Sequence, residues 1–214
     1  MSLVLHSYWR ATAPYRVRIG LNLKGLAYDY VPVNLIKAEQ SGPDHLARNP
    51  QGLVPALETG EVTLTQSLAI LEWLEETHPT PALLPTTPDE RARVRALAAL
   101  VACDIHPINN RRILEYLRHT LNVDEAAINT WCAHWITQGF DGYEALLRAN
   151  TQRGRFSFGD VPGLADVYLV PQVESARRFK VDMARWPLIS AVDAACMALE
   201  AFQKAAPAVQ PDAS

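Results

Sequence analysis

Residues 3–33 read LVLHSYWRATAPYRVRIGLNLKGLAYDYVPV, and the order of patterns within them decides the fold. Residues 3–8 are a short, mostly apolar stretch bounded by a loop, which predicts a β-strand. Over residues 15–24 the apolar residues recur at helical spacing, with a proline before them and a glycine after them, which predicts an α-helix. Residues 28–33 predict a second strand. This order of elements predicts two parallel strands joined by a right-handed crossover.

The rest of the first eighty residues continues this α/β pattern. Residues 49–57 predict a turn and then a short strand that begins at Pro55, and residues 63–64 offer a brief partner strand. A proline in that position can follow a cis peptide bond, which exposes the neighbouring backbone to a ligand, although a plain turn fits the pattern as well. Gln66 and Ser67 open a further helix, and we expect Ser67 to be its N-cap.

Prolines are dense over residues 78–88, which predicts a linker. After it, no strand pattern remains, and apolar residues near a period of 3.6 predict an all-α bundle with helices over 89–103, 107–120, 124–150, 164–179 and 187–206. We therefore expect an α/β domain over residues 1–80, a linker over 81–88 and an all-α domain over 89–214, whose end from residue 207 is a loose tail.

The composition excludes several classes of protein. Of the 214 residues, 49% are hydrophobic and 20% are charged, which excludes extended disorder. The 20 Lys and Arg against 23 Asp and Glu leave no basic excess to neutralise nucleic acid. No apolar run approaches the roughly 20 residues that span a bilayer, and the first ten residues lack a secretion signal. We expect a cytoplasmic protein without nucleic-acid or membrane partners.

The three cysteines, Cys103, Cys132 and Cys196, are an odd number and lie far apart. No CxxC pair and no zinc-type Cys/His spacing is present, so we expect no metal site. We expect all three to be reduced, buried thiols.

Polar residues gather at two predicted helix starts. Arg10 and Thr12 stand in the loop between the first strand and the first helix, where the helix dipole favours an anion or a thiolate. Gln66 and Ser67 offer amides and a hydroxyl that suit a carboxylate, although an ordinary helix cap is the commoner interpretation.

Further arginines stand in the second part of the chain. A break in the helical pattern near residue 106 is followed by Arg111 and Arg112, which lie about 100° apart on a helix and so cannot share one face. Arg178 ends a predicted helix together with Arg177, and for one of this pair the better interpretation is interaction with the helix dipole. Together with Arg10, these arginines would make a cationic cleft for a small dianion, since guanidinium groups bind carboxylates bidentately.

A series of landmarks runs through the chain in order: Tyr8-Trp9-Arg10 and residues 15–19, 49–57, 66–74 and 159–166. With this series the chain resembles the zeta-class glutathione transferases over nearly its whole length. The resemblance implies a thioredoxin-like N-terminal domain that binds glutathione, an all-α C-terminal domain and a homodimer.

The resemblance also implies roles for single residues. The backbone at Val54 and Pro55 would pair with the cysteinyl part of glutathione, and Gln66 and Ser67 would hold its γ-glutamyl end. Three residues would complete the glutathione shell: Gln51, Asn109 and His106. In one arrangement, His106 would reach glutathione across the dimer. Four arginines would take the carboxylates of a small dicarboxylate substrate: Arg10, Arg111, Arg112 and Arg178.

Within that class, residues 103–118 and 170–179 most resemble the branch that isomerises maleylpyruvate to fumarylpyruvate. Arg111 stands where the branch that isomerises maleylacetoacetate usually has an apolar residue. The implied reaction is thiolate addition to the cis double bond, bond rotation and elimination, with glutathione as the cofactor.

The chain departs from the family pattern at two places. Residues 11–13 are Ala-Thr-Ala where the family has two serines and a cysteine, so the hydroxyl of Thr12 is the only one left there. Gly163 replaces the usual Ser or Thr helix cap, and Asp166 remains to support that helix start.

Alternative functions remain open beside maleylpyruvate isomerisation. The first is isomerisation of maleylacetoacetate, and the second is conjugation of glutathione to an electrophile, which the four arginines disfavour for an apolar substrate. The third is glutathione binding without catalysis. Thiol–disulfide exchange is disfavoured because no cysteine lies between Trp9 and Arg16.

Overall fold

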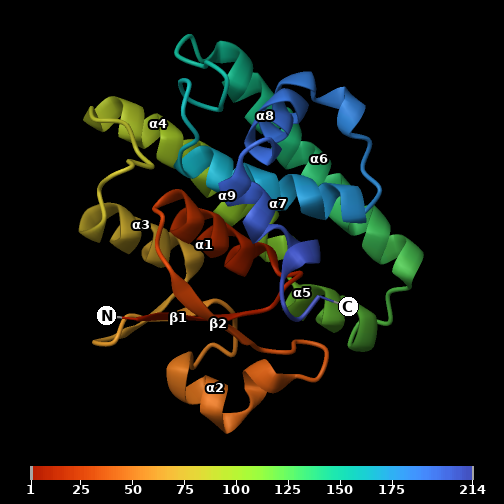
Figure 1. Cartoon of the computed structure of the whole chain (residues 1–214). Helices are drawn as coiled ribbons and strands as arrows, with labels where there is room; N and C mark the ends of the chain where they lie inside the picture. The colour runs from red at the N-terminus through yellow and green to blue at the C-terminus, as the bar shows by residue number, and fades with distance from the viewer. Residues whose placement is uncertain (1, 214) are drawn as a thin grey trace. The chain divides into compact units, whose positions relative to one another are not determined.

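The computed structural model describes residues 2–213, and contacts group them into two compact units (Figure 1). One unit contains the residues up to Leu83 together with those from Met197 onward, and the other runs from Leu84 to Cys196. The last residues of the chain thus pack with the first ones. The expected division into domains over 1–80 and 89–214 with a linker over 81–88 stays a prediction.

The first unit is built on a sheet whose four strands, within residues 2–213, are β1 (Leu3–Ser7), β2 (Tyr28–Pro32), β3 (Ala56–Glu58) and β4 (Thr63–Thr65). The strand order is β2-β1-β3-β4. The predicted parallel pair is confirmed, since β1 and β2 run parallel, whereas β3 is antiparallel to both β1 and β4. This is the mixed sheet of a thioredoxin-like domain.

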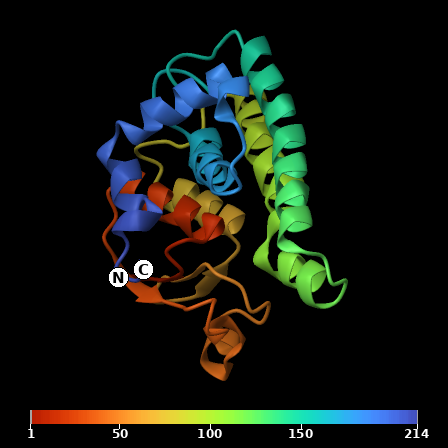
Figure 2. The ribbon, with the colours of Figure 1, turned by 90° about the vertical axis from the view of Figure 1, so that its right-hand side faces the viewer.

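Helices cover both faces of this sheet. α1 (Thr12–Leu23) and α3 (Ser67–Thr77) lie on one face and α2 (Pro43–Arg48) on the other (Figure 1, Figure 2). α2 and the short 3₁₀ turn η1 (Glu39–Ser41) before it were absent from the sequence-based prediction. The core between the sheet and its helices consists of fully buried apolar side chains, among them Leu5, Val17, Ile19, Leu57, Ile70 and Leu71.

α1 packs against both α3 and α9 (Glu200–Ala205). Gly20 of α1 lies so close to the side chain of Leu71 that an added Cβ would collide with it, and glycine therefore permits the close packing of α1 on α3. On the other side, the Asn22 side chain donates a hydrogen bond to the Ala201 carbonyl oxygen at 2.9 Å. The C-terminal helix is thus an integral part of this unit.

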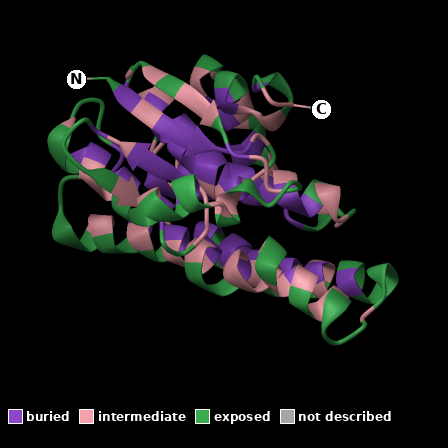
Figure 3. Cartoon of the chain, turned by 90° about the horizontal axis from the view of Figure 1, so that it is seen from below, coloured by how far each residue is buried: buried purple, intermediate pink, exposed green. Residues whose placement is uncertain are grey.

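The second unit consists of helices joined by loops: α4 (Pro88–Ala99), η2 (Leu100–Ile105, a π-helical turn), η3 (Pro107–Asn109), α5 (Arg111–His119), α6 (Glu125–Ala149), α7 (Leu164–Arg178), η4 (Met183–Arg185) and α8 (Pro187–Met197). Twelve of the fifteen residues of α7 are buried, and α7 packs against α4. Figure 3 shows the chain coloured by burial, with the buried residues in purple. The predicted all-α character of this part is confirmed.

Asp166 anchors the start of α7, as expected. One carboxylate oxygen accepts a hydrogen bond from the Gly163 N–H at 2.8 Å, and the other accepts one from the Ser157 N–H at 2.9 Å. Asp166 is 1% exposed, so both bonds are shielded from water. The carboxylate of Asp166 thus supplies one half of a capping box, and Gly163 has no side chain to supply the other half.

Two helix starts differ from the prediction. α1 begins at Thr12, so Thr12 is a helical residue rather than a loop residue. α3 begins at Ser67 with Gln66 as its N-cap, so the expectation that Ser67 is the cap was wrong. The reason is the backbone of Gln66, which has φ 68° and ψ 119° and turns the chain into the helix one residue earlier.

The C-terminal segment was also predicted wrongly in two respects. Residues 187–206 form α8 and α9 rather than one helix, because Leu199 is extended (φ −96°, ψ 134°) and separates them. The tail is not loose: it continues into the 3₁₀ turn η5 (Pro207–Val209), and the Gln210 side chain donates to the carbonyl oxygens of Lys204 and Ala206, each at 2.9 Å.

All three cysteines are free, and Cys132 and Cys196 are buried as expected. Cys103 is exposed, which corrects the expectation that it is buried. It lies in η2 between the buried residues Val101 and Ile105, on the side of this turn that faces solvent.

Among residues 2–213, no helix is long and apolar enough to cross a membrane. Within the same residues, no cluster of three or more His, Cys, Asp or Glu side chains is arranged to hold a metal ion.

Candidate active site

The segment between the end of β1 and the start of α1 contains two of the predicted residues. Arg10 lies in the loop and is exposed, and Thr12 begins α1 with 8% of its surface exposed. The N-cap Ala11 has no side chain that could accept from the first-turn amides of α1. The N-terminus of α1 therefore has no capping side chain, and the positive end of its helix dipole favours a bound negative charge.

Two glutamines expected in the glutathione shell meet in the structure. The Gln66 side-chain amide donates a hydrogen bond to Gln51 Oε1 at 2.6 Å, across fifteen positions of the sequence. Gln66 holds a positive φ of 68°, which is costly for a residue with a side chain and is concentrated at functional sites in proteins. Its neighbour Ser67 accepts a hydrogen bond from the guanidinium of Arg16 at 3.4 Å.

The backbone at Val54 is open for pairing. The Val54–Pro55 peptide is cis, and neither the N–H nor the carbonyl oxygen of Val54 makes a hydrogen bond with another residue among 2–213. The preceding Leu53 carbonyl oxygen accepts from His45 Nε2 at 2.8 Å and from the Asn49 side chain at 2.7 Å. The segment is thus fixed at Leu53 and presents free backbone groups at Val54, as an extended peptide ligand requires.

Three supporting residues of this region were missed by sequence reasoning: Arg16, His45 and Asn49. Asn49 had a signal, because it opens the predicted turn, and its side-chain oxygen accepts from the Gln51 N–H at 3.1 Å. His45 lies on α2, which the sequence pattern does not predict, and Arg16 stands in the sequence only as part of a helical pattern. Both are buried, at 5% and 2% exposure.

In the second unit, His106 and Asn109 follow the π-helical turn η2. Both side-chain polar atoms of Asn109 are buried and have no hydrogen-bond partner within the described residues. A buried amide without partners costs free energy unless a ligand or water satisfies it. Asn109 therefore has the donor and the acceptor that a polar ligand would use.

Arg111 and Arg112 are the first two residues of α5, and both are exposed. Arg111 Nη2 lies 3.7 Å from Glu115 Oε1, which Arg118 Nη1 approaches to 3.1 Å. The Asn110 side chain caps the helix by accepting from the Arg112 N–H at 3.1 Å. The Arg111 ion pair is long and solvated, so it leaves the guanidinium able to bind an anion.

Arg178 is the last residue of α7 and donates to the Ser175 hydroxyl at 3.1 Å. Burial raises the pKa of Cys132 on α6 to about 11, although the positive charges of Arg178 and Arg118 oppose this shift. Arg177, by contrast, forms an ion pair with Asp193. Of the two arginines at this helix end, Arg177 is thus engaged with a carboxylate.

Comparisons with known proteins connect these features. Residues 1–76 match the family described as "Glutathione S-transferase, N-terminal domain". Over 210 residues the chain is 64% identical to a maleylpyruvate isomerase of Ralstonia sp., a match that covers 98% of this chain and 99% of the relative.

Solved structures agree with this match. One is the holo structure of a maleylpyruvate isomerase described as a bacterial glutathione S-transferase of the zeta class, with a TM-score of 0.97 at 64% identity, covering 99% of this chain and 100% of that chain. A maleylacetoacetate isomerase from Anaeromyxobacter dehalogenans was solved with glutathione (TM-score 0.89, 48% identity) and with dicarboxyethyl glutathione and citrate (TM-score 0.88, 47% identity). Each of these covers 100% of this chain and 98% of that chain.

Proposed function

The chain belongs to the zeta class of the glutathione S-transferase family, and from this premise we propose that it isomerises maleylpyruvate to fumarylpyruvate with glutathione as its cofactor. The observation that carries the choice of substrate is the 64% identity to a maleylpyruvate isomerase over 98% of the chain. The maleylacetoacetate isomerase from Anaeromyxobacter dehalogenans is 48% identical. Arg111, a cation at the start of α5, supports a dicarboxylate substrate because it suits a carboxylate, and it supports the same choice because the maleylacetoacetate branch usually has an apolar residue at this position.

Glutathione fits the residues of the first unit. The free N–H and carbonyl oxygen of Val54, before Pro55, would pair with its cysteinyl backbone, as one extended chain pairs with another. Gln66 and Ser67 at the start of α3 would hold its γ-glutamyl carboxylate, where the helix dipole favours negative charge. Gln51 would orient the Gln66 amide through the hydrogen bond that joins them.

His106 and Asn109 are also proposed to bind glutathione. The argument is strongest for Asn109, because its buried amide has no partner within residues 2–213. For His106 the support is its place in the turn just before Asn109. A homodimer would allow either residue to contact glutathione on the partner subunit.

Bound glutathione supplies a thiol that, as thiolate, adds reversibly to the cis double bond and allows rotation about it. Thr12 would stabilise the negative charge at sulfur with its hydroxyl and with the N-terminal amides of α1. The arginines would hold the substrate carboxylates and offset the charge that develops on the substrate during the reaction: Arg10, Arg111, Arg112 and Arg178.

The dicarboxyethyl glutathione in the related maleylacetoacetate isomerase supports this chemistry. Its name describes a glutathione with two carboxyl groups on a two-carbon chain, and it was found in that enzyme's active site. A ligand of this kind combines the thiol with a small diacid. We take it as support for a site that accepts both.

The test is turnover of maleylpyruvate with glutathione present in catalytic amount. We expect fumarylpyruvate to form stoichiometrically while the glutathione concentration stays constant. Consumption of glutathione to a thioether, with no trans product, would replace the proposal by electrophile conjugation. Binding of glutathione without turnover of any substrate would replace it by a non-catalytic role, and faster turnover of maleylacetoacetate would change the substrate.

The role of Arg111 is tested by Arg111→Leu, with Arg148→Leu on α6 as its matched control. Arg148 also makes a long contact to a glutamate four residues away, 3.6 Å against 3.7 Å for Arg111. Loss of a charge-assisted hydrogen bond of about 1.5–3 kcal/mol should lower kcat/KM for maleylpyruvate about 10- to 100-fold. Conjugation of chlorodinitrobenzene, which has no carboxylate, should change little. Equal effects on both substrates would remove Arg111 from carboxylate binding.

We further propose that the protein is a cytoplasmic homodimer. The apolar side chains of Val62 and Leu68, 54% and 43% exposed on the first unit, are available for a second copy of the chain. Light scattering coupled to size exclusion should give twice the chain mass of 23.7 kDa. A monomer at micromolar concentration would contradict this assembly.

A further inference from the structure

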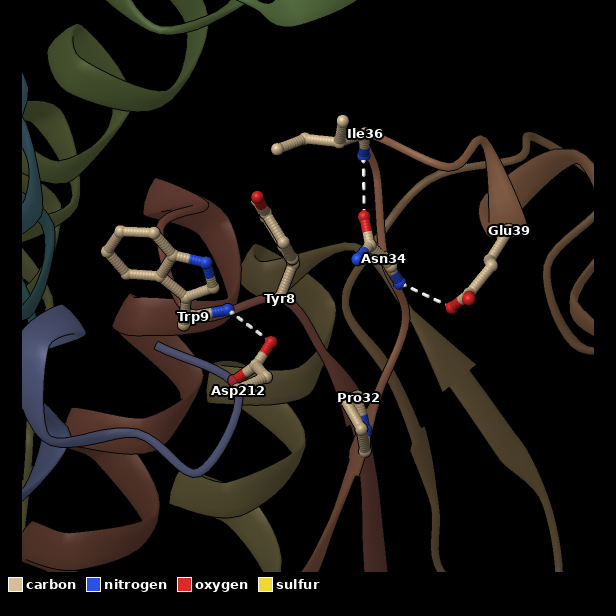
Figure 4. Close-up of a pocket in the computed structure, with 7 residues that line it drawn as sticks. All are labelled: Tyr8, Trp9, Pro32, Asn34, Ile36, Glu39 and Asp212. Atoms are coloured by element: carbon tan, nitrogen blue, oxygen red, sulfur yellow. Dashed lines mark hydrogen bonds between the residues drawn. The ribbon is translucent and has the colours of Figure 1, made fainter. Parts of the chain in front are cut away.

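The C-terminal tail is hydrogen-bonded to the loop that carries Arg10 and leads into α1 at Thr12. One oxygen of Asp212 accepts a hydrogen bond from the Trp9 backbone N–H at 3.1 Å, as Figure 4 shows. The other oxygen accepts from the Tyr30 hydroxyl of β2 at 2.7 Å. A carboxylate 203 positions away in sequence thus joins the active-site loop to the sheet.

The other side of Trp9 is held by a buried cation. Arg18 is 0% exposed, and its guanidinium donates to the Trp9 carbonyl oxygen at 3.0 Å. The same guanidinium donates to the Ser7 hydroxyl at 3.2 Å and to the Ala205 carbonyl oxygen at 2.9 Å. The peptide group before Trp9 is therefore fixed by a carboxylate and the peptide group after it by a guanidinium.

Asp212 is itself firmly placed. The Ala213 N–H bonds back to the Gln210 carbonyl oxygen at 3.0 Å, and the Gln210 side chain is bound to the end of α9. α9 in turn packs on α1, the helix that begins at Thr12. The tail is therefore anchored to the unit on which its carboxylate acts.

Within the loop, the Ala11 N–H donates a hydrogen bond to the Tyr8 carbonyl oxygen at 3.1 Å, and the contacts at Trp9 add to this turn. Ala11 caps α1 without a side-chain hydrogen bond, so the contacts at Trp9 set the direction in which the following residues leave β1. A cavity of about 240 Å³ lies beside the loop, lined by Trp9, Asp212 and five neighbours (Figure 4). Without the carboxylate, the Trp9 segment has space into which it can shift.

We propose that Asp212 is a positioning residue for the isomerase: through the Trp9 backbone it holds Arg10 and Thr12 in the place that the reaction needs. This inference rests on the proposed function. It does not make Asp212 a catalytic residue, since its carboxylate is occupied by Trp9 and Tyr30. A misplacement of reacting groups by about 1 Å can lower a rate by about 100-fold.

The experiment compares Asp212→Ala with Asp212→Asn and with Asp29→Ala as the matched control. Asp29 is an exposed residue of β2 next to Tyr30, so its replacement makes the same change of charge without touching the loop. The asparagine variant keeps an oxygen that can accept from the Trp9 N–H. It should therefore rescue most of what the alanine variant loses.

The first readout is independent of activity. Labelling with ¹⁵N-tryptophan gives backbone signals from five tryptophans, and Trp9→Phe identifies the one from Trp9. Hydrogen exchange of the Trp9 amide should be about 10-fold or more faster in Asp212→Ala, since a hydrogen bond to a charged acceptor is lost. It should be unchanged in Asp29→Ala and close to wild type in Asp212→Asn.

The second readout separates positioning from general damage. In Asp212→Ala, kcat for maleylpyruvate should fall about 10-fold, whereas glutathione affinity by calorimetry should stay within about twofold because Gln66 and Ser67 are untouched. An unchanged Trp9 exchange rate, or equal losses in Asp212→Ala and Asp29→Ala, would overturn the proposal. A wild-type protein without isomerase activity would overturn the proposed function and the catalytic part of this inference, while the exchange rate would still decide whether Asp212 holds the loop.

Discussion

Replacing Asp166 by alanine should destabilise the second unit far more than an average substitution. Asp166 is 1% exposed, and its two oxygens accept from the N–H groups of Gly163 and Ser157 at 2.8 and 2.9 Å. Each hydrogen bond to a charged acceptor contributes about 1.5–3 kcal/mol, so the pair contributes about 3–6 kcal/mol. Burial raises the pKa of Asp166, which shows that keeping the carboxylate from water offsets part of this gain. We expect a net loss of about 2–4 kcal/mol.

For a chain of this length, each kcal/mol lost from the free energy of unfolding lowers Tm by about 2–4 °C. Asp166→Ala should therefore lower Tm by about 4–16 °C. Thermal unfolding by circular dichroism and urea unfolding at constant m-value measure the change. Asp166→Asn should fall between wild type and the alanine variant, because one amide oxygen still accepts a hydrogen bond.

The control is Asp160→Ala. Asp160 also accepts from a backbone N–H, that of Arg155 at 3.0 Å, but it is exposed. Its loss should cost less than about 1 kcal/mol, since water replaces an exposed bond. If Asp166→Ala lowers Tm no more than Asp160→Ala does, the two shielded hydrogen bonds do not stabilise the start of α7, and the reasoning fails.

Two further predictions concern ionisable groups. Hydrogen bonds from Arg48 and then His6 lower the pKa of Glu58, so its carboxylate favours the folded state at neutral pH. At pH 7 the wild type should be more stable than Glu58→Gln by less than about 1 kcal/mol, because the ion pair of Glu58 with Arg48 is partly exposed. Urea titrations should show this difference vanish as the pH falls through the lowered pKa of Glu58. Of the free cysteines, exposed Cys103 should react rapidly with Ellman's reagent in the native protein, whereas buried Cys132 and Cys196 should react only after unfolding; rapid reaction of more than one thiol would contradict their burial.

The parts of the fold that the sequence predicts are those in which a long stretch repeats one pattern. The apolar residues of β1 and the helical spacing over α1 are enough to predict both elements, although burial extends beyond one face: four of the five residues of β1 and all of residues 14–21 are buried. α2 has six residues, too few for a helical period to show, and it was missed. Helix ends were the least accurate, since the start of α3 depends on the φ of a single residue, Gln66.

The site divides in the same way. The residue types at Gln51, Val54 and Gln66 follow from family motifs, but the hydrogen bond between the two glutamines depends on how the turn and the sheet bring residues fifteen apart together. No local pattern indicates that Asp212 reaches Trp9 across 203 positions, and the tail was therefore expected to be loose. Contacts of this kind arise from tertiary packing, which short-range periodicity in the sequence does not indicate.

At Gln66, the stability of the fold and the proposed affinity for glutathione favour different residues. Its positive φ costs on the order of 1–3 kcal/mol, a strain that glycine would largely remove. An engineer who selected only for a higher melting temperature would therefore favour glycine at this position. The resulting protein would lose the side chain that donates to Gln51. It would be more stable and, given the proposed role of Gln66, would bind glutathione more weakly. If Gln66 binds glutathione as proposed, the strain at this residue lowers the stability of the fold in return for binding.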